Sequence, residues 1–452
     1  MGHVHTNKME PEASRTENQS VISKELAAVR QEVIQEINRR RDEFVDLCAQ
    51  IVRHPTENPP GDTLALADFV TDWLKAQGIE SEAVEPKPSL KSVLSTFNGD
   101  RSTGLHFMFN GHLDVFPAGD ASQWAFSPFA GRIAEGRIQG RGVADMKGGL
   151  TASLIAYALL YRYRSVLPAR ISIMAVADEE TGGLWGTDWI LKSRPEWLPD
   201  ACLIGEPCSP DAVRIGEKGI SWLHLTISGR SYHGSLGAGE NCILQMAEAL
   251  LLLKEVTKLP ARIPEELRAV IEKAKNHNLN EDTRDRGWLL ERPSYNVGRI
   301  EGGMKVNISP QKVEADVDIR VPYGLTPQEI LSWARSRLDQ AGMKDARVDL
   351  FPFHSPANYT APNHPLTRVV IDNAAEHYGQ EPTITITTGG TDGRFFRQRG
   401  IPTIIYGPRP QGMAGLDEYI TIDDFLAVLK VHACAAIDYM GRATKGRPVS
   451  PG

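Results

Sequence analysis

Residues 105–114 read LHFMFNGHLD, a short apolar run that ends in an asparagine, a glycine, a histidine and an aspartate. Two further apolar runs end in acidic residues: Ile171–Ala177 before Asp178-Glu179-Glu180, and Ala201–Ile204 before Gly205-Glu206-Pro207. Gly148–Tyr163 lies between the first two runs, and its Ala, Leu and Tyr residues recur at a helical period. Strands that alternate with helices predict an α/β fold with a mostly parallel sheet.

The polar side chains after these runs are expected to meet. A further strand candidate, around Gly136–Gly140, leads into a loop that carries Asp145. In open α/β sheets, ligands bind beyond the carboxyl ends of the strands. One edge of the sheet therefore collects a histidine and five acids: His112, Asp114, Asp145, Glu179, Glu180 and Glu206.

This set of side chains predicts a metal site, because an imidazole among carboxylates suits Zn, Mn or Co. His112 and Asp114 are two apart, so they project to one side of an extended segment, where Asp114 can orient the imidazole ring. A carboxylate at Asp145 could bridge two ions. Glu179 and Glu180 point in different directions, so one can bind metal while the other is a general base.

The middle of the chain has a different pattern. Strand-like and helix-like segments follow one another there in the order of a β-α-β-β-α-β unit, with Ser221–Ser228 and Val313–Val321 as alternating strands. We therefore expect a small α+β domain of the ferredoxin-like kind, inserted into the α/β domain. The expected divisions are a disordered tail at 1–20, the α/β domain at 21–216 and 355–441, the insertion at 217–354, and a tail at 442–452. A long amphipathic helix is expected at Val21–Val52, where apolar residues recur at three, four or seven.

Composition narrows the class of protein. The 452 residues carry 50 Lys and Arg against 57 Asp and Glu, a net charge of −7. Such a balance argues against a nucleic-acid partner, since phosphate binding favours a basic surface. Five scattered cysteines fit a reducing compartment. With neither an apolar N-terminal segment nor a long apolar run, we expect a cytoplasmic protein without a membrane span.

The motifs resemble those of the acetylornithine deacetylase, succinyl-diaminopimelate desuccinylase, aminoacylase and carboxypeptidase G family of metallohydrolases. The resemblance extends from about residue 41 to 439 and rests on these stretches: NGHLDVFPAGD (110–120), GRGVADMKGG (140–149), ADEETGG (177–183), IGEP (204–207), GRSYHGS (229–235), MKVNISP (304–310), VDIRVP (317–322), TGGTDGRFF (388–396) and LDEYI (416–420). It implies a catalytic α/β domain with an inserted lid domain that usually forms a dimer.

The resemblance also assigns roles to individual metal-site residues. His112 and Glu206 would hold one metal ion, Asp145 would bridge, and Glu180 would hold the second ion. Glu179 would be the general base, and Asp114 would orient His112.

Further roles fall outside the metal site. His233 would stabilise the carbonyl oxygen, often from the partner subunit; the alternative for His233 is a polar residue in a glycine-rich turn. Asn307 and Arg320 would contact substrate, the arginine holding a carboxylate; the alternative for Arg320 is a surface salt bridge. Thr391 and Asp392 would line the cleft, or form a plain turn.

One position departs from the family pattern. Relatives normally carry a histidine about four residues before the Glu of the DEY-like motif, and it completes the second metal site. Here Ala414 stands four residues before Glu418. His432, the nearest later histidine, lies in an apolar helical run and is expected in the core. We therefore expect one tight metal site and a second that is weak or empty.

The sequence thus predicts a hydrolase that cleaves a C–N bond with a metal-activated water. The expected substrate is a small molecule with a carboxylate, such as an N-acyl amino acid or a dipeptide-like amide. Two alternatives stay open: an aminohydrolase of the 5-nitroanthranilate type that releases ammonia from an activated aminobenzoate, and a non-catalytic scaffold. A homodimer or larger homo-oligomer is expected to form through the lid.

Overall fold

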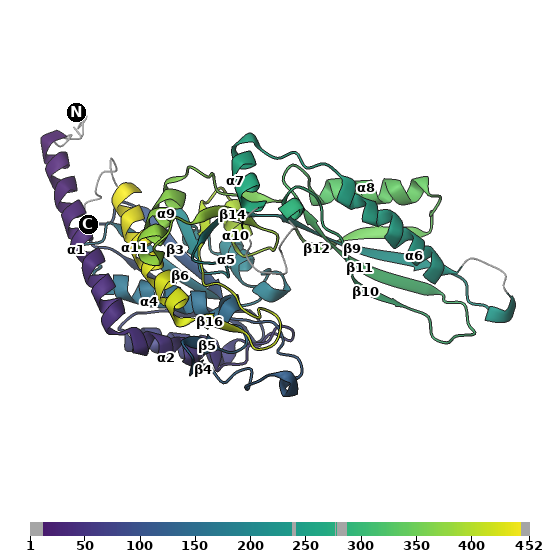
Figure 1. Cartoon of the computed structure of the whole chain (residues 1–452), viewed down its shortest axis with the longest axis horizontal. Coiled ribbons are helices and arrows are strands. Elements are labelled where there is room, and N and C mark those ends of the chain that lie inside the picture. Colours follow the sequence, from purple (N-terminus) through teal and green to yellow (C-terminus); the bar gives the residue numbers. More distant parts are fainter. Residues whose placement is uncertain (1–11, 237–240, 276, 278–286, 444–452) are drawn as a thin grey trace, which may run out of the picture. The chain divides into compact units, whose positions relative to one another are not determined.

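The computed structural model describes residues 12–236, 241–275, 277 and 287–443 (Figure 1). The chain divides into two compact units. The first comprises residues 1–211, 365–381 and 406–452, and the second comprises residues 212–364 and 382–405. The domain boundaries expected at residues 217 and 354 stay a prediction.

Five neighbouring strands of a larger sheet form the centre of the first unit. Its strands run in the order β1 (Glu82–Lys87), β2 (Leu90–Asn98), β6 (Ala169–Val176), β3 (Leu105–His112) and β7 (Ala201–Ile204). Strand β3 pairs in parallel with β6 and with β7, while β2 is antiparallel to β6. Every residue of β3 is buried, as is typical of a central parallel strand covered on both faces. The expected strand–helix alternation is thus present.

Helices surround this sheet. They are α2 (Arg41–Val52), α3 (Leu64–Ala76), α4 (Gly148–Arg162), α5 (Thr187–Ser193), α9 (Pro365–Tyr378) and α11 (Ile422–Ala443). Helix α11 packs against α4 and α9 (Figure 1). A small three-stranded sheet has the order β16 (Tyr419–Thr421), β5 (Arg137–Gln139) and β4 (Arg132–Ala134).

Among the described residues, one helix, Val143–Arg162, is long and apolar enough to span a membrane by length and composition. Of its most apolar window, 94% is buried inside the protein. It is therefore a core helix, in contact with β3 and β6 of the sheet.

The N-terminal helix differs from the prediction in two ways. Helix α1 runs from Glu12 to Arg39, so it includes residues 12–20 of the segment expected to be a disordered tail. Residues 1–11 lie outside the described part. The single helix expected at 21–52 is two helices, because Arg40 leaves helical geometry at φ −101° and ψ 21° before α2 begins. Periodicity could not show this break, since buried apolar residues continue at helical spacing through both helices. At the other end, α11 includes residues 442 and 443 of the predicted tail, and residues 444–452 lie outside the described part.

The second unit contains the predicted β-α-β-β-α-β order. Its elements are β9 (Gly219–Ser228), α6 (Cys242–Leu253), β10 (Asn296–Gly302), β11 (Lys312–Val321), α8 (Pro327–Gln340) and β12 (Ala346–Ser355), with an additional helix α7 (Glu265–Lys275). The strands form an antiparallel sheet in the order β10-β11-β9-β12. Apolar residues of β9 and β11 pack with α6 and α8 in one core. The helices therefore cover one face of this sheet.

The rest of the second unit is built around β8 (Ala212–Glu217). It pairs in parallel with β14 (Thr383–Thr387) and antiparallel with β13 (Asn358–Tyr359) and β15 (Thr403–Ile405). Helix α10 (Gly393–Arg397) follows the TGGTD segment.

Candidate metal centre

His112 is the last residue of β3, and its side chain is 1% exposed. Its Nε2 atom lies 3.2 Å from Oδ1 of Asp145 and 3.6 Å from Oε1 of Glu206. Glu206 follows β7, the strand beside β3, so the parallel pairing of these strands brings the two side chains together. The predicted convergence at the strand ends is present.

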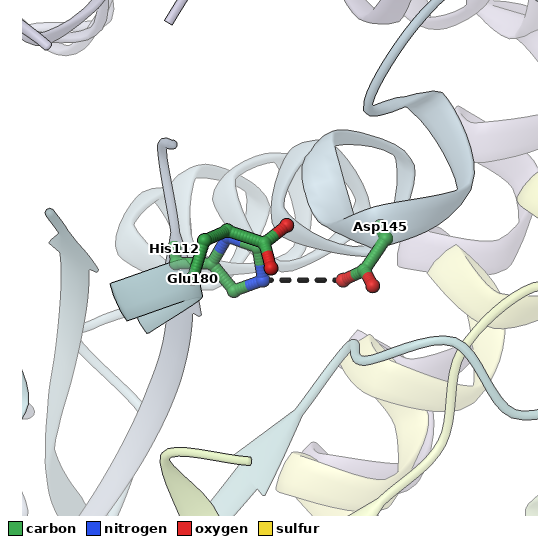
Figure 2. A group of neighbouring side chains, drawn as sticks. All are labelled: His112, Asp145 and Glu180. Atoms are coloured by element: carbon green, nitrogen blue, oxygen red, sulfur yellow. Dashed lines mark hydrogen bonds and ion pairs between the residues drawn. The ribbon is translucent and has the colours of Figure 1, made fainter. Parts of the chain in front are cut away.

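In the part of the chain that the structure describes, two overlapping groups of side chains could hold a metal ion. His112, Asp145 and Glu180 form one, and His112, Glu179 and Glu206 form the other; in each, one ligand atom per residue lies within 4.8 Å of the others. Figure 2 shows the carboxylate of Asp145 pointing at the imidazole of His112, with the carboxylate of Glu180 beside that ring. Glu179 and Glu180 thus belong to different groups, as expected for adjacent side chains that point in different directions.

Asp114 holds this arrangement through two different parts of the residue. Its main-chain oxygen lies 2.8 Å from Nδ1 of His112. Its buried carboxylate accepts the backbone N–H groups of Glu179 and Glu180, at 3.2 and 3.1 Å, and the side-chain amide of Asn58 at 2.8 Å. The carboxylate therefore positions the turn that carries both glutamates.

Glu418 positions Asp145 in a comparable way. Its Oε1 atom accepts the backbone N–H of Ala144 at 2.8 Å, while Oε2 accepts from the Arg141 guanidinium at 2.5 Å. Arg141 also donates to the main-chain oxygen of Gly415 at 2.7 Å. The side chains of this pair are 2% and 1% exposed. The sequence analysis used Glu418 only as a landmark and did not single out Asn58, because neither residue has a local pattern that predicts its distant partner.

The electrostatics of the site favour a cation. Burial lowers the pKa of His112, but Asp145 and the charges of Glu206 and Asp114 outweigh it and raise that pKa well above its usual value. Burial and the charge of Asp145 raise the pKa of Glu180 well above its usual value. The Oε1 atom of Glu180 is buried and accepts no hydrogen bond from the described part of the chain. An orphaned buried carboxylate oxygen fits a metal ligand.

Neither His432 nor Ala414 supplies a second imidazole. Ala414 lies in an exposed turn at φ 59°. His432 is a core residue, as predicted: it is fully buried, Nδ1 lies 3.0 Å from the Ser153 hydroxyl, and Nε2 lies 2.7 Å from the Tyr406 main-chain oxygen. Within the described residues, His112 is the one imidazole in both groups.

His233 and Asn307 lie together in the second unit. Residues His233 and Ile308 form an antiparallel bridge, and the N–H of Gly234 donates to the main-chain oxygen of Asn307 at 2.9 Å. The imidazole of His233 is exposed, with Nδ1 2.7 Å from the Ser235 hydroxyl. The Oδ1 atom of Asn307 is buried and has no hydrogen-bond partner among the described residues. Two residues 74 positions apart thus form one local structure.

The remaining predicted substrate residues also belong to the second unit. Arg320 is the penultimate residue of β11, and its Nε atom lies 2.9 Å from Oδ1 of Asp318. Thr391 is buried, and its hydroxyl donates to the Glu217 carboxylate at 2.7 Å. Asp392, 1% exposed, precedes helix α10. Thr391 therefore already has a structural partner in Glu217.

Comparison with known proteins identifies the family of this chain. The family described as peptidase family M20/M25/M40 matches residues 108–438. The chain belongs to this family. It is a hydrolase that acts on C–N bonds, and the family resemblance drawn from its motifs is confirmed.

Relatives and solved structures in this family cover nearly the whole chain. A succinyl-diaminopimelate desuccinylase of Rhodospirillum centenum is 28% identical over 402 residues, covering 86% of this chain and 95% of the relative. The M20 metallo-carboxypeptidase of Sulfolobus solfataricus has a TM-score of 0.74 at 20% identity, covering 88% and 99% of the two chains. A dinuclear metal-binding M20 peptidase of Bacillus subtilis has a TM-score of 0.60 at 15% identity, covering 90% and 99%. The fold class is confirmed, and a divalent metal ion is supported.

Proposed function

We propose that this M20-family hydrolase removes an acyl group from an N-acyl amino acid, or cleaves a small dipeptide-like amide, in a substrate that carries a free carboxylate. The observation that carries this proposal is the group of one imidazole and four carboxylates at the ends of β3, β6 and β7 and in the segment after β5, in which His112 and Glu206 are buried. Relatives named as desuccinylases and carboxypeptidases support the type of bond.

Glu179 is the general base in this proposal. A divalent ion held by His112, Asp145, Glu180 and Glu206 would polarise the scissile carbonyl and lower the pKa of a water from ~15.7 towards 7. Glu179 takes the proton of the attacking water and passes it to the leaving nitrogen. Hydrogen bonds from its backbone N–H and that of Glu180 to Asp114 fix the turn, so the carboxylate stays in place for both transfers.

The residues outside the metal group bind the substrate. Arg320 pairs with the substrate carboxylate, since a guanidinium binds a carboxylate with two parallel hydrogen bonds. His233 donates to the carbonyl oxygen as negative charge develops there, and Asn307 beside it offers its side-chain amide. Thr391 and Asp392 also line the substrate site in this proposal.

The metal content in this proposal is one tight ion and one weak or absent ion, of Zn, Mn or Co. Glu180 and the shared Asp145 are the ligands left for the second position where Ala414 replaces a histidine. Three or more ligands with an imidazole are usual for a tight catalytic ion.

A homodimer formed through the inserted domain is also proposed. Helix α6 exposes Leu244 and Leu251 at 70% and 71%, and β10 exposes Ile300 at 53%. Exposed apolar side chains of this size mark an interaction surface when they are grouped. Light scattering of the purified chain at several concentrations tests this: a mass of one chain throughout would contradict it.

A substrate panel tests the proposed reaction. Purified protein loaded with Mn, Zn or Co is given N-acyl amino acids, dipeptides and amino-substituted benzoates, and the release of carboxylate and of ammonia is measured separately. Carboxylate release from the N-acyl amino acids or new amino termini from the dipeptides, without ammonia, supports the proposal. Ammonia release from the aminobenzoates alone would replace it with the aminohydrolase reaction.

A further inference from the structure

One face of the four-stranded sheet in the second unit is not covered by α6 and α8. Trp222 of β9 and Asp318 of β11 are direct cross-strand partners on this face. The Trp222 indole N–H donates to Oδ1 of Asp318 at 3.0 Å, and Arg320, two residues further along β11, approaches the same oxygen with Nε at 2.9 Å. One carboxylate thus holds both an indole and a guanidinium.

The guanidinium of Arg320 keeps its outer edge available. Asp318 engages Nε, and among the described residues no side chain or main-chain oxygen binds Nη1 or Nη2. The side chain is 24% exposed. A guanidinium held at Nε and open at its Nη atoms can donate to a carboxylate from that edge. Asp318 therefore fixes the direction of Arg320 without occupying all of its donors.

Two further aromatic side chains lie beside Trp222, which shares Asp318 with Arg320. The ring of Trp222 makes edge-on contacts with Phe351 at 5.9 Å and Phe353 at 5.4 Å between centroids. Arg394 lies over the ring of Phe353, 4.9 Å from its centroid. The rings of Trp222, Phe351 and Phe353 are all half-buried, so each presents apolar surface. We name these three rings the aromatic wall.

We propose that the aromatic wall and Arg320 form one substrate subsite, which selects a carboxylate with an aromatic or large apolar substituent nearby, and that Asp318 is a positioning residue for Arg320. This rests on the proposed function, in which Arg320 holds the substrate carboxylate. The physical reason is that an apolar group on the wall is removed from water while the carboxylate stays paired. A substrate with a small or charged side chain lacks the first of these gains.

Three small ligands that the enzyme cannot hydrolyse as amides separate the parts of this subsite. They are 3-phenylpropanoate, which has ring and carboxylate; propanoate, which lacks the ring; and 3-phenylpropanol, which lacks the carboxylate. Calorimetry with the metal-loaded full chain should give 3-phenylpropanoate an affinity at least about tenfold above both others. Equal affinities for the three ligands would overturn the proposal.

Variants assign the effect to named residues. Arg320→Met should remove the preference for 3-phenylpropanoate over 3-phenylpropanol, which separates binding at Arg320 from carboxylate binding at the metal. Asp318→Asn should weaken both carboxylates about tenfold and leave 3-phenylpropanol unchanged. Trp222→Leu should lower the affinity of 3-phenylpropanoate towards that of propanoate, whereas Trp222→Phe should retain part of the preference.

Asp316→Asn is the matched control. Asp316 lies two residues before Asp318 on the same face of β11, and it pairs with His224 and Arg299 instead. Its substitution should leave all three affinities unchanged. If Asp318→Asn behaves like Asp316→Asn, Asp318 has only a structural role and the positioning role is wrong.

Binding and turnover give separate outcomes. A protein that binds 3-phenylpropanoate selectively but hydrolyses no amide would contradict the proposed function and retain the subsite. A protein that hydrolyses N-acetylglycine and N-acetylphenylalanine with equal kcat/KM, and binds the three ligands equally, would retain the function and lose the subsite.

Discussion

The Nδ1 atom of His112 lies 2.8 Å from the main-chain oxygen of Asp114 and 3.7 Å from the nearest carboxylate oxygen of the same residue. The backbone of Asp114 is therefore its closer contact with the imidazole. The carboxylate is bonded instead to the N–H groups of Glu179 and Glu180. Asp114 thus links the histidine at the end of β3 to the glutamates after β6, and the separate roles of its backbone and its carboxylate can be tested.

Substituting Asp114→Asn separates its two contacts. The main-chain oxygen remains for His112, whereas the amide presents fewer acceptors to the turn at residues 179–180. We expect kcat to fall at least about tenfold while metal affinity changes less than tenfold, because a carboxylate that oriented the metal-binding histidine would cost about 10–100-fold in affinity. Steady-state kinetics and metal titration measure both. A large loss of metal affinity with unchanged kcat would reverse the assignment.

Glu179→Gln tests the general base. The amide is nearly the same size as the carboxylate but cannot take a proton, so kcat should fall by about 10²–10⁴-fold. The number of metal ions bound per chain, measured by inductively coupled plasma mass spectrometry, should stay the same. Glu135→Gln, on an exposed residue, serves as the control. Retained activity in Glu179→Gln would contradict the assignment of Glu179 as the general base.

Ala414→His tests whether the missing imidazole limits the second metal position. Ala414 is at φ 59°, in the left-handed region, where histidine occurs more often than most residues. We expect the wild-type chain to retain about one Zn after dialysis and the variant to approach two. The neighbouring Met413, 45% exposed, provides the control Met413→His. Two tightly held ions in the wild type would contradict the prediction.

Glu418→Gln tests the buried pair behind Asp145. Removing one partner leaves Arg141 as an uncompensated buried charge, so the free energy of unfolding should fall by about 3 kcal/mol. Urea unfolding of the metal-free protein measures this without a contribution from the ion. The exposed pair of Arg194 with Glu196 gives the control Glu196→Gln, which should leave the midpoint unchanged. Equal effects of the two substitutions would show that burial is unimportant here.

Stability should fall on mild acidification because of His432. Burial lowers the pKa of its imidazole to about 4, against 6.5 in the unfolded chain. The neutral folded form is thus favoured above pH 6.5, and stability is lost as the pH falls from 6.5 through 4, since the unfolded chain takes up the proton first. Between pH 7 and pH 5, protonation of this one imidazole in the unfolded chain should lower the free energy of unfolding by about 2 kcal/mol.

The control for that pH dependence is the variant His432→Gln, compared with wild type by urea unfolding at pH 7 and pH 5. Glutamine does not titrate. The free energy of unfolding that is lost between pH 7 and pH 5 should therefore be smaller in the variant by about the same 2 kcal/mol. Burial also lowers the pKa of His106 and His377 to about 4, so the variant keeps part of the dependence. An identical loss in both proteins would exclude His432 as the cause.

Sequence alone determined the α/β class, the small β-α-β-β-α-β unit and the set of side chains at the metal centre. The reason is local: burial on both faces makes a central strand such as β3 largely apolar, and its last residue, His112, falls at the sheet edge where ligands bind. The order of this unit requires a strand between α6 and β11, but the apolar pattern did not locate it, because β10 is exposed throughout and has no apolar alternation to detect.

Tertiary structure alone decided which atoms hold the site together. Asn58 reaches Asp114 across 56 positions, and Glu418 reaches Ala144 across 274. A buried polar group must be paired, and its partner comes from whichever chain segment packs beside it. The spacing of residues along the chain does not predict that segment. Tertiary structure also decides whether the carbonyl or the carboxylate of Asp114 contacts His112. This depends on side-chain rotations that are fixed only when the chain packs.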